Sequence, residues 1–232
     1  MHTGGTLTQN NAFRLNGNQL KLIALLTMTA DHVGLQLLPQ WGFLRILGRL
    51  AMPLYAYMIA EGCRHTRSRK RYLLRMAGLA AVCQVVYFVA MESLYQCILV
   101  TFSLSICLIY ALDNLQQHPG TGSRLLALGT LTVVFALCVV LPDFLPGFEI
   151  DYGLMGVLLP VLIYFGKPSH HFLLAGVILL CLGTGGIQWW SLCAIPLLGM
   201  YNEQRGKTNM GRVFYIYYPL HLVVIYGLSL VL

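Results

Sequence analysis

Charged residues are scarce in this chain of 232 residues. Only 10% of the residues are Asp, Glu, Lys or Arg, and only 8 are acidic. Soluble globular domains carry about 25% charged residues. With a hydrophobic fraction of 57% and a mean hydropathy of +0.70, the scarcity excludes an ordinary soluble domain. It predicts an all-α, polytopic membrane protein.

Several motifs of soluble enzymes are also missing. The sequence has no GxSxG, P-loop, GxGxxG, HExxH or CxxC pattern. Its seven cysteines are an odd number and most lie within apolar runs, so they indicate small apolar side chains rather than disulfides or zinc ligands. We therefore expect no metal.

The first residues are polar and do not form the apolar core of a secretory signal peptide. We expect residues 1–19 to be a polar cytoplasmic tail, and the first span to be retained as an anchor. Residues 20–232 are expected to form a single transmembrane domain.

Apolar runs follow one another along the whole chain. A helix needs about 20 residues to cross a bilayer, and the sixth to eighth runs are shorter, so any of them could be re-entrant or tilted. The count is about nine transmembrane helices (8–10). The runs are Leu20–Leu38, Phe43–Gly62, Tyr72–Met91, Tyr95–Leu112, Leu125–Leu141, Tyr152–Phe165, Phe172–Thr184, Trp189–Tyr201 and Val213–Val231.

The positive charges alternate with these runs. With nine spans, every Lys and Arg outside a span falls on one side, whereas Glu92, Asp143, Glu149 and Asp151 fall on the other. Lys and Arg accumulate in cytoplasmic loops. The pattern predicts a cytoplasmic N-terminus. The location expected for the protein is the bacterial inner membrane, which the resemblance described below implies. The net charge of +7 then reflects topology and not nucleic-acid binding.

Four ionisable residues lie inside the first two runs. A charge at bilayer depth costs about 2.5–3.5 kcal/mol, and helical rise puts His32 and Arg49 at the same level. One interpretation is a structural ion pair, in which Asp31 holds Arg45 or Arg49 and joins two helices. The other is catalytic: His32 acts as a general base and the guanidiniums stabilise developing charge. Two guanidiniums, a carboxylate and a histidine exceed what one structural pair needs, so we favour the catalytic interpretation.

A basic edge borders the first three runs. Lys21 lies eleven residues, about three helical turns, before His32. Arg71 and Arg75 are four residues apart and suit either a polyphosphate or anionic lipid headgroups. Glu61 and His65 lie at the same edge, where Glu61 is expected to be an ion-pair partner.

Tyr217, Tyr218 and His221 surround Pro219 in the last run. They are expected either to line the cavity of His32 or to be packed in the core. Pairing of His32 with His221 as metal or haem ligands is a further alternative, although other ligand spacings are missing.

Four stretches of the chain resemble a known family. The run LKLIALLTMTADHVG (20–34), the run RILGRLAMPLY (45–55), Glu61-Gly62 and YPLHL (218–222) are similar to TraX proteins over the whole length. The type member of that family acetylates the amino terminus of a conjugative pilin subunit. TraX proteins in turn are similar to the acyltransferase 3 group, in which an Arg, ten residues and a catalytic His occupy the first span. Lys21 and His32 have this spacing, with Lys in place of Arg.

The resemblance implies acetyl transfer across the membrane. Acetyl-CoA would dock its phosphates at Lys21, Arg71 and Arg75. Its thioester would approach His32 as general base, with Asp31 orienting the imidazole and Arg45 and Arg49 stabilising charge. The acceptor would be an extracytoplasmic pilin or glycan. We expect His32, Arg45 and Arg49 to converge on one chamber that is open to the basic edge.

Other functions remain open. A transporter would also place His, Asp and Arg at mid-membrane, but it usually contains an internal repeat, and no second Asp-His and Arg hairpin occurs. A non-catalytic assembly or lipid-binding protein is a further alternative. The expected partners are membrane lipids, acetyl-CoA and the acceptor, and small residues from Gly153 to Gly156 permit a homodimer.

Overall fold

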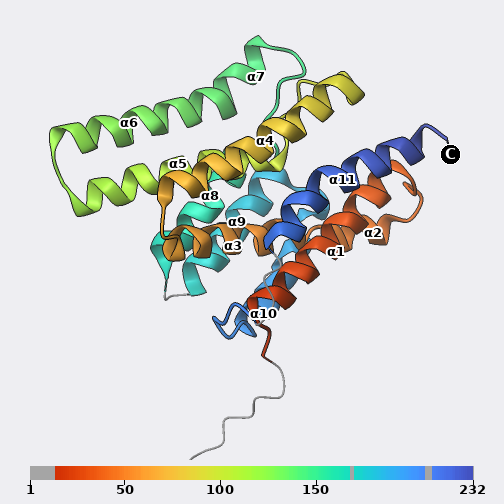
Figure 1. Ribbon diagram of the computed structural model, residues 1–232, viewed down its shortest axis with the longest axis horizontal. Coiled ribbons are helices and arrows are strands. Elements are labelled where there is room, and N and C mark those ends of the chain that lie inside the picture. Colours follow the sequence, from red (N-terminus) through yellow and green to blue (C-terminus); the bar gives the residue numbers. More distant parts are fainter. Residues whose placement is uncertain (1–13, 168–169, 207–210, 232) are drawn as a thin grey trace, which may run out of the picture.

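The computed structural model describes residues 14–167, 170–206 and 211–231, and every element in this part of the chain is helical (Figure 1). Most of the expected tail therefore lies outside the described residues. The elements are α1 (Gly17–Gln36), α2 (Gly42–Gly48), α3 (Ala51–His65), α4 (Arg69–Met91), α5 (Ile98–Gln117), α6 (Thr121–Phe135), a π-helical segment (Ala136–Val140), α7 (Leu141–Phe144), α8 (Gly153–Gly166), α9 (His170–Thr184), a 3-10 helix (Gly186–Cys193), α10 (Ala194–Gly199) and α11 (Gly211–Ser229).

Four helical stretches are long and apolar enough to cross a membrane: Gly42–His65, Arg69–Val89, Ile98–Gln117 and Thr121–Phe144. Helices α8 and α9 and the end of α11 are apolar but shorter. The all-helical prediction is confirmed, and the apolar helices are compatible with a membrane protein. The count of nine spans and the cytoplasmic N-terminus stay predictions.

Helix α3 is the centre of the bundle. Its Leu54, Ala56 and Ala60 are completely buried, and it packs against α1, α5 and α8. Helix α6 lies outside the bundle, beside α5 (Figure 1). Only 11% of the most apolar stretch of α6 and α7 is buried, so most of its Leu and Val side chains face outward, with Val134 as a buried exception. An outward apolar surface of this kind fits contact with lipid.

The second predicted span is interrupted. Residues Arg49 and Leu50 form a turn between α2 and α3. The carbonyl of Arg49 accepts a hydrogen bond from the Ser191 hydroxyl at 2.9 Å. This bond replaces the helical hydrogen bond from residue 53, which is Pro53 and has no N–H. The break leaves a short α2 packed against α1.

The eighth predicted span, Trp189–Tyr201, is wrong as a single helix. The chain there forms a 3-10 helix and then the six-residue α10. Gly185 and Gly186 both have positive φ, which turns the chain before the 3-10 helix. Gln188 then points inward, where it is 2% exposed and binds Arg49. The fifth predicted span also departs from a regular helix, because the π-helical segment lies just before Pro142.

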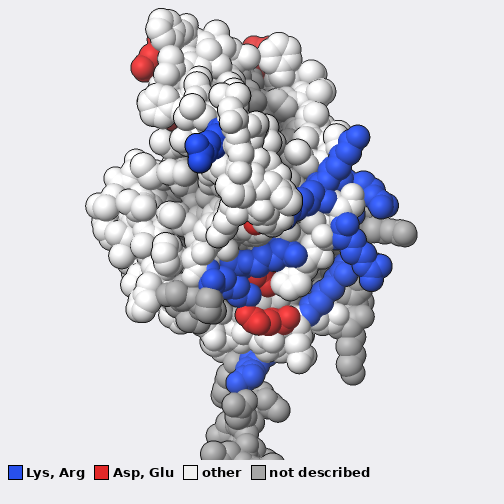
Figure 2. Space-filling view, turned by 90° about the vertical axis from the view of Figure 1, so that its left-hand side faces the viewer, with Lys and Arg blue, Asp and Glu red and all other residues white. Residues whose placement is uncertain are grey.

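Lys and Arg side chains gather at one end of the molecule, around acidic side chains (Figure 2). The ends of α3 and α8 and the start of α4 meet there, because Arg64 donates to the carbonyl of Ile163 and Lys167 binds Glu61. The predicted separation of basic and acidic loops therefore corresponds to two ends of the bundle. Residues 207–210, including the predicted basic residue Lys207, lie outside the described part.

Candidate functional site

Asp31 binds both arginines of the second apolar run. Its carboxylate accepts from Arg45 Nη1 at 2.8 Å and from Arg49 Nη2. Arg49 Nε also donates to the carbonyl of Arg45 at 3.2 Å. A Cβ atom at Gly48 would lie 2.2 Å from Asp31 Oδ1, so only glycine lets α2 approach α1 this closely. The structural interpretation of Asp31 is therefore supported directly, and it includes both guanidiniums.

Arg49 also connects this ion pair to distant segments. It is 8% exposed and donates to Gln188 Oε1 at 3.2 Å and to the Tyr152 hydroxyl at 3.4 Å. The sequence analysis missed Gln188 and Ser191, which bond to each other at 2.5 Å. The only signal in the sequence is two polar residues in an apolar stretch that follows a glycine turn. Arg49 therefore connects α2 with the 3-10 helix and the start of α8.

His32 and His221 form an edge-to-face pair, with ring centroids 5.0 Å apart. His32 Nδ1 lies 2.8 Å from the Met28 carbonyl, and His221 Nδ1 lies 3.1 Å from the Tyr217 carbonyl. A carbonyl only accepts, so each neutral ring carries its hydrogen on Nδ1 and keeps a lone pair on Nε2. Nε2 of His221 is buried and has no hydrogen-bond partner in the described part of the chain. Both imidazoles are thus prepared to accept a proton or a hydrogen bond.

The Met28 carbonyl fixes His32, which is the role expected of Asp31. Neighbouring residues on a helix point in different directions, so Asp31 faces α2 while His32 faces α11. The expectation that Asp31 orients the imidazole is therefore wrong for this structure.

Two tyrosines surround the histidine pair. The ring of Tyr217 stacks on His221 at 5.4 Å, with 5° between the planes, and its hydroxyl bonds Thr29 Oγ1 at 2.8 Å. Tyr218 meets His221 edge-on at 5.2 Å. Tyr217, Tyr218 and His221 therefore form one aromatic cluster, and their expected role as a substrate-cavity wall stays a prediction.

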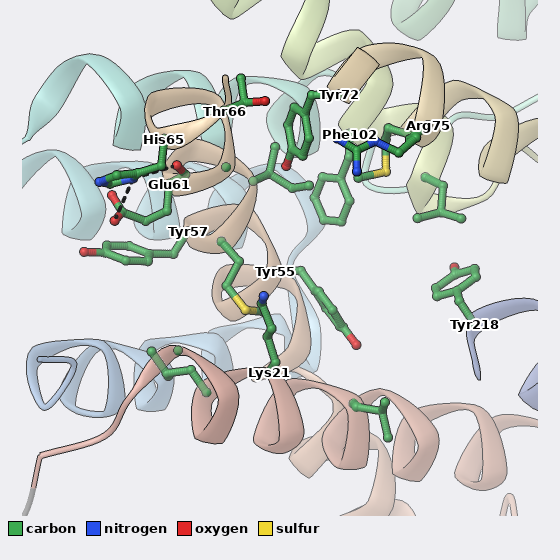
Figure 3. A pocket seen from close by; sticks show the side chains of 18 of the residues that line it. Lys21, Tyr55, Tyr57, Glu61, His65, Thr66, Tyr72, Arg75, Phe102 and Tyr218 are labelled. Carbon is green, nitrogen blue, oxygen red and sulfur yellow. Dashed lines mark hydrogen bonds and ion pairs between the residues drawn. The ribbon is translucent and has the colours of Figure 1, made fainter. Parts of the chain in front are cut away.

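A cavity of about 800 Å³ lies between α1, α3, α4, α5 and α11 (Figure 3). Lys21, Glu61, His65, Arg75 and Arg205 are its charged and basic lining residues. Glu61 and His65 lie together at one end, and Lys21 and Arg75 enter from α1 and α4, with Arg75 beside Phe102 (Figure 3). Apolar side chains line the middle, among them Leu25, Met58, Met76 and Phe102. Met28, Tyr55, Tyr217 and Tyr218 line the inner end. A basic entrance therefore leads to the residues that hold the histidine pair.

The cavity does not contain every predicted site residue. His32, His221, Asp31, Arg45 and Arg49 are not part of its lining, and Arg71 is exposed outside it. This cavity therefore does not bring His32, Arg45 and Arg49 together, and a chamber shared by the three stays a prediction. His32 lies one layer behind Met28 and Tyr217, and the arginines are held by Asp31 on another side of α1.

Glu61 is the centre of a charge cluster at the polar end of the cavity. Its carboxylate binds Arg64 Nη1 at 2.8 Å and Lys167 Nζ at 2.9 Å, and His65 Nδ1 lies 3.8 Å away. The prediction that Glu61 is an ion-pair partner at this edge is confirmed. In the described part of the chain, no three His, Cys, Asp or Glu side chains gather as metal ligands.

Comparison with known proteins identifies relatives along the whole chain. A probable fimbrial assembly protein, FimC of serogroup H1, from Dichelobacter nodosus is 26% identical over 89% of this chain and 93% of its own length. An uncharacterized protein of Rickettsia prowazekii is 47% identical over 38 residues, which are 16% of this chain and 15% of that protein. No solved structure shows significant similarity. The family model described as "TraX protein" matches residues 16–229, and the chain therefore belongs to the TraX family.

Proposed function

We propose that this protein is an acetyltransferase of the bacterial inner membrane. It would move an acetyl group from cytoplasmic acetyl-CoA to an acceptor on the outer side, a pilin amino terminus or a surface glycan. The cavity is the observation that carries the proposal, because its basic and apolar lining extends to Met28 and Tyr217, whose carbonyls bind the Nδ1 atoms of His32 and His221. The name of the FimC relative supports a role in fimbrial assembly.

The cavity matches the chemistry of the donor in its order of groups. Lys21, Arg75 and Arg205 would meet the phosphates, and the apolar middle would take the pantetheine arm. The volume lies within the range of about 300–1,000 Å³ that is typical of ligand sites. The thioester has to pass Met28 and Tyr217 to reach His32, so we propose that donor binding displaces the Tyr217 ring.

His32 is the proposed general base. A hydroxyl or amine of the acceptor attacks the thioester carbon while His32 Nε2 takes its proton, which gives a tetrahedral oxyanion. The carbon–sulfur bond then breaks, and the proton passes from the imidazolium to the sulfur, so CoA leaves as a thiol. Asp31, Arg45 and Arg49 together carry one positive charge in excess, which favours negative charge near α1. We further propose that the protein belongs to the wider acyltransferase 3-like superfamily, because Lys21 and His32 have the spacing of its Arg and catalytic His.

The first test uses the purified chain in a neutral detergent with acetyl-CoA. Water takes the place of the acceptor in this assay, so acetate and free CoA should appear steadily. His32→Ala should reduce the release of CoA at least 100-fold, because general bases contribute about 10²–10⁴ to the rate. His118→Ala is the matched control, since His118 is exposed at the end of α5. Chromatography should measure CoA, because free cysteines of the chain would consume a thiol reagent.

A transporter would give a different result. The break between α2 and α3 beside a buried arginine is a feature that transporters share. Uptake of a substrate into liposomes without thioester cleavage would support this second function and reject the enzyme. Mass spectrometry of pilins and envelope glycans from a strain lacking the gene would identify the acceptor.

A further inference from the structure

The segment from Tyr201 to Gly206 forms one wall of the cavity entrance. Tyr201, Glu203 and Arg205 line the cavity from this segment. It is bound to the start of α1 by three backbone hydrogen bonds: Leu15 to Met200, Asn202 to Leu15 and Gly17 to Gln204, at 2.7–2.9 Å. The backbone is thus fixed, while the Glu203 side chain is 64% exposed.

The Glu203 carboxylate binds Lys167, which lies next to the cavity but is not part of its lining. Its Oε1 lies 2.8 Å from Lys167 Nζ, which also binds Glu61 at 2.9 Å and lies 5.9 Å above the Tyr57 ring. Burial would lower the pKa of Lys167, but the hydrogen bonds to Glu203 and Glu61 outweigh it and raise that pKa. The Lys167 ammonium in turn lowers the pKa of Glu203. Both groups are therefore charged at neutral pH.

The two carboxylates on Lys167 are not equivalent. Glu61 also binds Arg64, so its charge stays balanced without Lys167. In the described part of the chain, the one ion pair recorded for Glu203 is with Lys167. An exposed ion pair contributes little to stability, so Glu203 can exchange Lys167 for water at small cost. A second anion with more charge can then take its place.

We propose that Lys167 is the cation of a phosphate subsite at the cavity entrance, and that Glu203 occupies this subsite until a phosphate of the acyl donor displaces it. The inference rests on the proposed function, because it takes the donor to be a CoA ester. Lys167 binds Glu61 and Glu203, which line the cavity together with Lys21, Arg75 and Arg205, so a polyphosphate that replaces Glu203 on Lys167 would have further cations nearby. A lysine ammonium is a compact positive charge with three N–H donors, and phosphate oxygens bind such groups readily.

Binding of CoA to the full chain in neutral detergent, measured by calorimetry, tests the proposal. Glu203→Gln should tighten binding about three- to tenfold, because it removes a competing anion near the entrance. Glu149→Gln makes the same change at the acidic end and should leave the affinity unchanged. Lys167→Gln should weaken binding about tenfold, and the gain from Glu203→Gln should disappear in that background.

The opposite result would reject the subsite. If the ion pair only fastens the segment, Glu203→Gln will weaken CoA binding or leave it unchanged. If lipid headgroups are the natural anion, Glu203→Gln will retain more anionic lipid without binding CoA more tightly, which also rejects the nucleotide proposal. A wild-type chain that binds no CoA would reject the proposed function itself. Normal CoA binding without a gain in Glu203→Gln would reject only the subsite.

Discussion

His221 shares with His32 a hydrogen bond from Nδ1 to the carbonyl four residues earlier. Its Nε2 is buried without a partner in the described residues, which a purely structural histidine would have no reason to maintain. A role in positioning the incoming nucleophile beside His32 explains both the free lone pair and the ring contact.

Two substitutions at His221 separate this role from packing. His221→Phe keeps a ring against Tyr217 and His32 but removes the acceptor, so CoA release should fall about tenfold while thermal stability is retained or rises. His221→Gln keeps an acceptor and should retain more activity than the Phe variant. Equal activity of the wild type and the Phe variant would show that His221 only fills space.

The Asp31 ion pairs make a prediction about stability. Asp31→Asn leaves two guanidiniums close together without a counter-charge, and breaking such a pair costs about 3–5 kcal/mol. Arg45→Met leaves one carboxylate and Arg49, which balance, so its cost should be clearly smaller. In detergent, Arg45→Met should unfold at a higher temperature than Asp31→Asn. The reverse order would mean that Arg45, and not Asp31, holds α2 in place.

At the scale of elements, the contact between α1 and α2 depends on Gly48. A Cβ atom there would overlap Asp31, so Gly48→Ala should lower stability by about 1–3 kcal/mol through forced separation of the helices. Gly42 lies in the same helix and has open space where a Cβ would be. Gly42→Ala should therefore be neutral or slightly stabilising in the same unfolding assay, and an equal loss in both variants would exclude the close approach as the cause.

The apolar pattern predicts most helices, but not their interruptions. Hydropathy cannot distinguish α2 and α3 from one continuous helix, because Pro53 is itself apolar although it has no N–H to donate to the Arg49 carbonyl. The hydroxyl that bonds this carbonyl instead belongs to Ser191, which is 142 residues away. The same holds for the stretch after Gly186, where Gln188 is buried by its bond to Arg49. Long-range contacts of this kind leave no periodic signal in either segment.

The sequence indicates which ionisable residues lie within the helices, but not which of them contact one another. The need of a buried carboxylate for a counter-charge predicted that Asp31 binds Arg45 or Arg49, and it binds both. Depth along the helices placed His32 at the level of Arg49. Depth does not say which way a side chain faces around the helix axis, so it merged His32 with the arginines. Lys167 and Glu203 were missed because their link requires α8 and the Tyr201–Gly206 segment to meet.

At the scale of the molecule, the basic and acidic ends predict a topology. Reporter fusions should test it: green fluorescent protein after Arg67 should fluoresce, and alkaline phosphatase after Asp143 should be active, if the basic end is cytoplasmic. The exchanged reporters should both be inactive. Activity of alkaline phosphatase after Arg67 would place the cavity entrance outside, where acetyl-CoA could not reach it.

The attachment of the Tyr201–Gly206 segment to Leu15 and Gly17 has a practical consequence. The start of α1, to which an amino-terminal affinity tag would be connected, lies beside the cavity entrance. The end of α11 lies at the far side of the bundle (Figure 1). Material purified through its carboxyl terminus is therefore the right starting point for ligand titrations, because a histidine tag at the other terminus could itself compete for the acidic groups there.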